Sequence, residues 1–216
     1  MMQFYSAMKT STLAISLFAV VCAAVIAVTQ VTTKDQIAKN EREQRAKALY
    51  EIVPKSTIDN DLLEDTIEVI APELQGNEQP ATVYLARKGG IVKTVILPLV
   101  APDGYSGNIH IIAGINADGS VAGVRVLAHK ETPGLGDKVD TKKSDWIFSF
   151  DGLSKTSKDD DRWAVKKDGG QFDQFTGATI TPRAVVNAVS RGVDYFTENR
   201  TVLLQQTNEQ TAEVAK

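Results

Sequence analysis

The sequence has few residues that could bind a metal or form a disulfide. Its 216 residues include one cysteine, Cys22, and two histidines, His110 and His129. A single thiol excludes an internal disulfide, a zinc knuckle and a cysteine-ligated iron–sulfur cluster within this chain. Two histidines are too few for a histidine-rich metal site, so the sequence predicts no bound metal.

An excess of basic charge is also absent, since 24 Lys and Arg residues face 27 Asp and Glu residues. The formal net charge is −3, whereas a protein that binds nucleic acid needs a basic face to meet the phosphates. We therefore expect no nucleic-acid partner. The length fits one domain of ordinary size with an appendage, and an apolar content of 43% excludes a chain that is disordered throughout.

The common catalytic motifs are missing as well. The sequence contains no G-x-S-x-G elbow, no G-x-x-x-x-G-K-[ST] phosphate loop, no G-x-G-x-x-G turn and no H-E-x-x-H pair. His129 and Glu131 are close enough in sequence for an acid–base pair, but a histidine at the end of a strand is more often structural. No residue is therefore predicted to act as a catalyst.

Charges are absent from one long stretch near the N-terminus. Between Lys9 and Lys34 lie 24 uncharged residues. A helix of about 20 residues crosses a hydrocarbon layer roughly 30 Å thick, so this stretch is long enough to span a membrane. We predict a single transmembrane helix over residues 10–33, preceded by a short cytoplasmic tail of residues 1–9.

The same stretch allows two other interpretations. Small residues suited to signal-peptide cleavage occur at Ala23, Ala24 and Ala27. A lipoprotein would need a small residue before the cysteine, but Val21 precedes Cys22, so this interpretation is rejected. We favour a retained anchor over a cleaved signal peptide, with Cys22 as an apolar filler in the span.

The charges that flank the span give conflicting evidence on its orientation. One basic residue, Lys9, precedes the span, whereas basic residues follow it closely at Lys34, Lys39, Arg42, Arg45 and Lys47. The positive-inside rule would place the C-terminal part in the cytoplasm. Long domains, however, are translocated largely regardless of flanking charge. The flanking charges alone therefore leave the orientation open.

Residues 34–80 are predicted to form a stalk helix and a linker. Helix formers dominate from Lys34 to Val53 without Gly or Pro, and Pro54 ends the helix. The apolar stripe of this helix is thin, which indicates a polar stalk rather than a core element. A loop rich in Asp, Glu and Asn continues to Pro80.

The next part of the chain has strand character. Four such segments follow one another: Ala81–Arg87, Ile91–Val100, Asn108–Ile115 and Val121–His129. Lys88-Gly89-Gly90 and the segment 116–120 (NADGS) are typical of hairpin turns, so the strands form an antiparallel meander. The predicted class is α+β: a small antiparallel sheet with packed helices, over residues 81–200.

The last strong helical pattern spans Pro182–Glu198. Its apolar residues recur at helical spacing, at Val185, Val189, Val193 and Phe196. Thr181 is predicted to be the N-cap and Pro182 the first helical residue. Residues 201–216 are predicted to form a polar tail.

The segment 131–136 (ETPGLG) is the first of two candidate ligand loops. Gly134 and Gly136 remove side chains on either side of Leu135, so that the backbone can approach a flat ligand. A plain tight turn is the alternative explanation for the same residues.

The segment 173–179 (DQFTGAT) is the second candidate loop, and it runs directly into the last helix. Unpaired amides and the positive end of the helix dipole favour a phosphate at a helix N-terminus. Gly177 and Ala178 leave space beside it, and hydroxyl groups are offered by Thr176, Thr179 and Thr181. A plain capped helix start is the alternative.

Together the two loops resemble the covalent FMN-binding domain family. Residues 173–179 are similar to its D-x-x-[ST]-G-A-T flavinylation motif, and residues 131–136 are similar to the partner loop upstream. With the N-terminal span and the segment Thr57–Asp65, the chain resembles the G subunits of Rnf-type (also called Rsx) ion-translocating electron transport complexes over essentially its whole length. The longer C subunits of sodium-pumping NADH:quinone reductases are a related alternative.

The resemblance implies a flavoprotein that relays electrons within a bacterial inner-membrane complex, with its C-terminal domain in the periplasm. In this family the last threonine of the motif carries FMN through a phosphoester bond, which implies that Thr179 does so here. Thr176, Gly177 and Ala178 would shape the turn, and Thr181 with the helix start would steady the phosphate. Attachment would need a flavin transferase, because no base is evident near Thr179.

The upstream loop is expected to line the isoalloxazine or ribityl part of FMN through Glu131, Thr132, Gly134, Leu135 and Gly136. Trp146 is a further candidate for contact with the ring, although core packing is the role that we favour for it. The implied partners are the other subunits of the membrane electron transport complex. Two rival functions are a membrane-anchored FMN redox-sensing or regulatory domain and a structural subunit with a vestigial motif.

Overall fold

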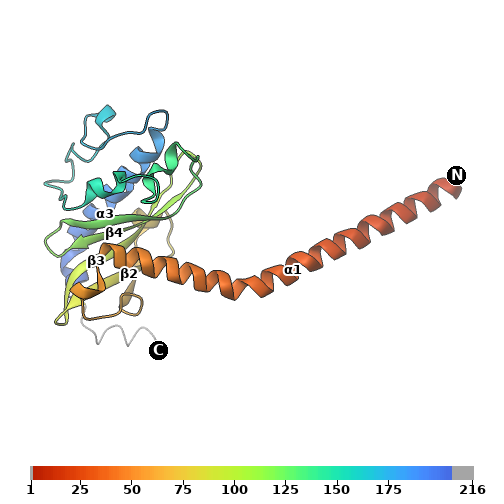
Figure 1. The fold of residues 1–216 in the computed structure, drawn as a ribbon, viewed down its shortest axis with the longest axis horizontal. Helices are drawn as coiled ribbons and strands as arrows, with labels where there is room; N and C mark the ends of the chain where they lie inside the picture. The colour runs from red at the N-terminus through yellow and green to blue at the C-terminus, as the bar shows by residue number, and fades with distance from the viewer. Residues whose placement is uncertain (1, 206–216) are drawn as a thin grey trace. The chain divides into compact units, whose positions relative to one another are not determined.

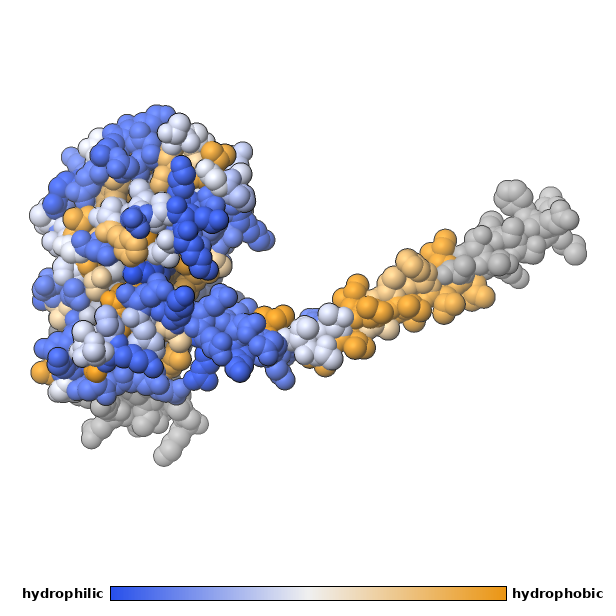
Figure 2. All heavy atoms as spheres, viewed as in Figure 1, coloured by the Kyte–Doolittle hydropathy of each residue, from blue (hydrophilic) through white to orange (hydrophobic). Residues whose placement is uncertain are grey.

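The computed structural model describes residues 2–205, which separate into two units at Gln44 and Arg45. The first unit is helical and belongs to α1 (Met2–Ile52), which continues into the second unit. Apolar side chains along it, such as Leu17 and Ile26, are exposed, and the helix is long and apolar enough to cross a membrane. Figure 2 shows the surface of α1 changing from hydrophobic to hydrophilic along its length.

The second unit is built on a five-stranded antiparallel sheet in which each strand pairs with the next along the chain. The strands are β1 (Thr66–Ile70), β2 (Pro80–Lys88), β3 (Ile91–Ala101), β4 (Ile109–Asn116) and β5 (Val121–Ala128). The last four agree with the predicted strands to within one residue at each end. The predicted α+β class is confirmed.

The loop predicted before Pro80 is partly wrong. Residues 66–70 form the edge strand β1, in which Thr66 lies opposite Tyr84 of β2. Short helical turns flank it, namely η1 (Lys55–Thr57) and α2 (Pro72–Gln75). Pairing with β2 stabilises β1, and a segment of five residues carries too little pattern of its own to reveal this.

Helix α3 (Ile180–Leu204) covers one face of the sheet, as Figure 1 shows. Val185, Val189 and Val193 are buried there, in the same core as Leu97 of β3 and Ile111 of β4. These valines are part of the apolar face that the helical spacing predicts. The main core of the domain therefore lies between α3 and the sheet.

Helix α3 is longer than predicted at both ends. Its start at Ile180 precedes Pro182 by two residues. Residues 201–204, predicted as part of a polar tail, form its last turn, in which Leu203 is buried. The rest of the predicted tail, residues 206–216, lies outside the described residues.

The end of α1 covers part of the opposite face of the sheet. Leu49, Ile52 and Val53 are buried there and form a second, smaller core with sheet residues that include Tyr84, Ile96 and Ile112. The Nε of Arg125 in β5 donates to the Glu51 carboxylate at 3.1 Å and ties the helix end to the sheet. The interpretation as a polar stalk is therefore wrong for these last turns, whose apolar stripe is too short to stand out in the sequence.

The segment between β5 and α3 folds onto the sheet domain. It contains three short 3-10 helices: η2 (Gly136–Val139), η3 (Trp146–Phe150) and η4 (Lys166–Asp168). Phe150, Trp163 and Phe172 pack against one another, with ring centroids 4.4 to 6.2 Å apart, and belong to the main core. This aromatic cluster anchors the chain between the two candidate ligand loops.

Candidate functional site

One cavity brings the two candidate ligand loops together. Its volume is about 310 Å³. Its lining residues come from three segments and are Tyr105, Glu131, Thr132, Leu135, Gly136, Gly177, Ala178, Thr179, Ile180 and Thr181. Most of the residues singled out in the sequence as ligand contacts therefore lie around a single space, although the two loops are far apart in the chain.

The start of α3 differs from the prediction in a way that matters for the site. Thr179, not Thr181, occupies the N-cap position, and its side chain makes no capping hydrogen bond. Thr179 instead contributes its backbone carbonyl, which accepts from the N–H of Arg183 at 3.3 Å. Pro182 is tolerated inside the first turn because no N–H there needs a partner within the helix. The Thr179 hydroxyl is thus not consumed in starting the helix.

Thr181 has a different partner from the one predicted. Its hydroxyl donates a short hydrogen bond to the carboxylate of Glu131. The other carboxylate oxygen of Glu131 accepts from the backbone N–H of Ser106 at 2.9 Å. Thr181 and Glu131 are both buried. Glu131 therefore joins three segments, namely its own loop, the turn after β3 and the first turn of α3.

The two glycines of residues 131–136 have separate roles. Gly134 has a φ of +79°, and a Cβ on it would meet no atom within 4 Å. Gly136 has no such space, because a Cβ there would lie 2.7 Å from both Glu131 Oε2 and Thr181 Oγ1. Gly134 is thus needed for the turn and does not line the cavity, whereas Gly136 allows the loop to approach the buried pair.

The residues before α3 form a tight turn. The N–H of Ala178 donates to the carbonyl of Phe175 at 3.0 Å, and Gly177 takes a φ of +78°. Phe175 is buried and anchors this turn in the main core. Thr176 is exposed and does not line the cavity. Of the three threonines, Thr179 alone combines a place at the cavity with a hydroxyl that makes no hydrogen bond within the described chain.

Trp146 is a candidate that the structure does not place at the cavity. Its Nε1 donates to the carbonyl of Asp173 at 2.7 Å. Its ring packs edge-on against Phe150 and Phe175, with centroids 5.6 and 5.2 Å away. Trp146 therefore holds residues 173–179 in place by packing and hydrogen bonding, in agreement with the role that we favoured over ring contact.

Charge around the cavity is sparse. Among the described residues that line it, Glu131 is the only charged one. Arg183 lies in the first turn of α3 but pairs with Asp168, with 2.6 Å between Nε and Oδ2, and this hydrogen bond lowers the pKa of the Asp168 carboxyl. Among the described residues at the cavity, the amides and dipole at the start of α3 are therefore the feature that favours an anion.

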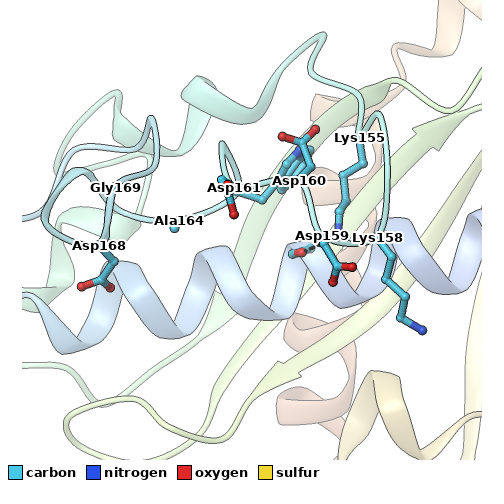
Figure 3. Close-up of a pocket in the computed structure, with 10 residues that line it drawn as sticks. Lys155, Lys158, Asp159, Asp160, Asp161, Ala164, Asp168 and Gly169 are labelled. Atoms are coloured by element: carbon cyan, nitrogen blue, oxygen red, sulfur yellow. Dashed lines mark hydrogen bonds between the residues drawn. The ribbon is translucent and has the colours of Figure 1, made fainter.

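A second cavity, of about 550 Å³, shares no lining residue with the first (Figure 3). Its charged lining residues are Lys155, Lys158, Asp159, Asp160, Asp161 and Asp168. Four of them are in close ion pairs: Lys155 with Asp194 at 2.8 Å, Lys158 with Glu198 at 3.0 Å, Asp160 with Arg162 at 2.6 Å and Asp168 with Arg183 at 2.6 Å. Figure 3 shows the aspartates spread along the chain rather than converging. Within residues 2–205, no group of three or more His, Cys, Asp or Glu residues could hold a metal ion.

Two lining residues of the first cavity are missing from the sequence-based prediction. Tyr105 lies in the turn after β3, a segment that the sequence marks only as rich in turn residues, and Ile180 is the first residue of α3. An aromatic residue between two glycines, Gly104 and Gly107, is the signal that could have pointed to Tyr105. Ile180 follows the motif directly, so the correct helix start would have included it.

The fold and the cavity define an FMN-binding domain preceded by an apolar helix, and comparison with known proteins agrees. Residues 104–194 match the FMN-binding domain family, and residues 1–52 match the family described as the RnfG N-terminal region. The first match covers both loops that surround the cavity and identifies FMN as the cofactor of the domain.

Curated relatives are similar over nearly the whole chain. The G subunit of the ion-translocating oxidoreductase complex of Pseudomonas aeruginosa (strain UCBPP-PA14) is 48% identical over 91% of this chain and 92% of its own. That of Aliivibrio fischeri (strain MJ11) is 48% identical over 91% and 94%, and that of Vibrio atlanticus 46% over 93% and 96%. The chain therefore belongs to the family of ion-translocating oxidoreductase complex G subunits, which confirms the resemblance found in the sequence.

Proposed function

We propose that this chain is the membrane-anchored flavoprotein subunit of an Rnf-type complex and relays electrons through FMN bound covalently to Thr179. The observation that carries the proposal is the position of Thr179. Its hydroxyl lies at a cavity formed by both flavin motifs, at the N-terminus of a helix, without a capping hydrogen bond. The other subunits of the complex are the proposed electron donor and acceptor.

The cavity offers suitable groups to both the phosphate and the flavin ring of FMN. The start of α3 offers unpaired amides and the positive end of a dipole to the phosphate. Leu135, Ala178 and Ile180 offer apolar surface to the flavin ring. The volume is at the low end of the about 300–1,000 Å³ typical of ligand pockets, so the cofactor would be partly enclosed. Partial enclosure suits a cofactor that exchanges electrons with neighbouring subunits.

A covalent bond would retain FMN in a cavity whose described lining has no cationic side chain to bind the phosphate. The described lining includes no Lys or Arg, and it includes the buried carboxylate of Glu131. Such a lining would hold a free dianionic phosphate weakly, since charge-assisted hydrogen bonds from cationic side chains are the strong ones. An ester to Thr179 would retain the cofactor without them.

Attachment is proposed to need a separate flavin transferase. A threonine hydroxyl is a weak nucleophile unless a base lies beside it. Glu131 is the one carboxylate that lines the cavity in the described chain, and both of its oxygens already accept hydrogen bonds, from Thr181 and Ser106. The residues of this chain would therefore hold and orient the hydroxyl, while the bound flavin supplies the redox chemistry.

The proposal is tested by expressing the full chain with and without a flavin transferase. With the enzyme, we expect a fluorescent band on a denaturing gel and, after proteolysis, a peptide containing Thr179 that carries the mass of FMN. Without the enzyme, the band should be absent. A chain that binds flavin only reversibly, and releases all of it on denaturation, would contradict covalent attachment.

We propose that residues 10–33 span the inner membrane, with residues 1–9 in the cytoplasm and the FMN-binding domain in the periplasm. The long domain outweighs the basic residues that follow the span, because long segments are translocated largely regardless of charge. Alkaline phosphatase fused to the C-terminus should be active in cells, whereas a reporter that works only in the cytoplasm should be inactive. The reverse pattern would place the domain in the cytoplasm.

A further inference from the structure

Arg125, a buried cation in β5, contacts two parts of the domain that lie far apart in the sequence. On one side, its guanidinium donates to the Glu51 carboxylate at 3.1 Å and to the Glu51 carbonyl at 3.4 Å, in the last turn of α1. On the other side, the guanidinium lies over the ring of Phe148 in η3, 4.7 Å from the ring centroid. A bond of 2.8 Å to the carbonyl of Val124 fixes it against its own strand. One planar group therefore connects the end of α1 with η3.

The end of α1 is closely packed on the sheet beside Arg125. Ile52, the last residue of α1, lies on two glycines that pair with each other across β4 and β5, Gly114 and Gly123. A Cβ on Gly114 would lie 2.5 Å from Ile52 Cγ2, and one on Gly123 would lie 3.5 Å from the same atom. Because packing this close leaves no free space, the last turn of α1 cannot shift without disturbing the hydrogen bonds of Arg125.

Helix η3 continues the series of contacts to residues 173–179. Phe148 shares this five-residue helix with Trp146. Nε1 of Trp146 donates to the carbonyl of Asp173 at 2.7 Å. The ring of Trp146 also packs edge-on against Phe175, with centroids 5.2 Å apart. A movement of η3 would therefore displace the segment that leads to α3.

We infer that Arg125 is a positioning residue that couples the end of α1 to residues 173–179. The contacts between them form a continuous series of packed and hydrogen-bonded groups, which is a physical route for such coupling. That these residues carry flavin rests on the proposed attachment to Thr179. Coupling between two sites is reciprocal, so a change at either end should alter the other. Forces that neighbouring subunits exert on α1 would thereby reach the flavin.

Amide hydrogen exchange of the full chain in detergent, without flavin, tests the coupling. Two amides report on the two ends, the N–H of Val53 after α1 and the N–H of Ala178 before α3, which donate to backbone carbonyls at 2.9 and 3.0 Å. Arg125→Ala should speed exchange at both amides, by roughly three- to tenfold. Glu51→Ala alters only the helix end, where the side chain is 39% exposed, yet it should also speed exchange at Ala178.

A reverse perturbation and two controls complete the experiment. Trp146→Phe keeps an aromatic ring but removes the Nε1 hydrogen bond, and it should speed exchange at Val53. Lys158→Ala breaks an exposed ion pair with Glu198 outside the series and should leave both reporter amides unchanged. Exchange at Ala113, buried in the middle of β4, follows global unfolding. A general loss of stability would speed exchange at all three amides, whereas coupling spares Ala113.

The flavinylated chain supplies a further signal. Arg125→Ala should lower the fluorescence anisotropy of the flavin, because the segment that carries it is less constrained. Exchange is measured without flavin, so a wild type that acquires no flavin would refute the proposed function and not this inference. Wild-type exchange at Ala178 in both Arg125→Ala and Glu51→Ala would show that Arg125 only fastens the helix, and would overturn the inference. Wild-type anisotropy in flavinylated Arg125→Ala, or wild-type exchange at Val53 in Trp146→Phe, would also overturn it. If Arg125→Ala does not fold, Glu51→Ala decides by both measurements.

Discussion

Thr179→Ala is expected to yield a full-length chain that inserts into the membrane, folds and carries no covalent flavin. The substitution removes the only cavity-lining threonine hydroxyl of the motif, one that makes no hydrogen bond within the described chain. The domain should remain folded, because the lost side chain makes no capping bond, whereas loss of a true N-cap bond typically costs about 1 kcal/mol. The measurement is in-gel flavin fluorescence of the denatured protein, normalised to the amount of chain.

Two variants serve as matched controls for this result. Thr179→Ser keeps a hydroxyl at the same position and should keep most of the flavin. Thr176→Ala removes a hydroxyl from the same motif, but Thr176 is exposed outside the cavity, so its flavin content should equal that of the wild type. Flavin that persists in Thr179→Ala and disappears in Thr176→Ala would move the attachment site to Thr176.

The sequence predicts the strands well because local signals determine them. The four strands of the meander follow from turn residues such as Gly89-Gly90, which set the hairpins, and from apolar alternation between the turns. Strand β1 lacks such signals. It is short, and pairing with β2 across an irregular connection decides its conformation. The same holds for the end of α1, where Leu49 and Ile52 become core residues only because the sheet lies beneath them.

At the site, too, local sequence predicts some features, whereas others depend on contacts between residues far apart in the chain. The motifs identify both loops and single out Thr179, and the structure places Thr179 at the cavity. The helix start is misplaced because Thr181-Pro182 has the local pattern of a cap followed by a first helical proline. Thr181 is instead engaged by Glu131, 50 residues earlier in the chain. A hydrogen bond over that separation is not visible in local sequence, and neither is the approach of Tyr105 to the cavity.

Glu131→Ala is expected to cause the largest loss of stability among single substitutions at the site. The change leaves the Thr181 hydroxyl and the Ser106 N–H without their acceptor near the cavity. Thr181 is buried, so its unpaired hydroxyl costs about 1–3 kcal/mol, whereas Ser106 is exposed and its N–H loses only about the 0.5–1.5 kcal/mol of an ordinary hydrogen bond. The free energy of unfolding should therefore fall by roughly 2–4 kcal/mol. Denaturant titration of the full chain in detergent can follow this through Trp146 and Trp163, the only two tryptophans and both within the sheet domain.

Matched variants separate the loss of these hydrogen bonds from the loss of a charge. Glu78→Ala removes an exposed carboxylate and should change stability by less than about 0.5 kcal/mol. Glu131→Gln keeps one carbonyl acceptor, so its loss should be intermediate. Thr181→Val added to Glu131→Ala removes the orphaned hydroxyl and should restore part of the stability, because apolar replacement of both partners can be nearly neutral. A Glu131→Ala chain as stable as Glu78→Ala would show that the buried contact does not hold the three segments together.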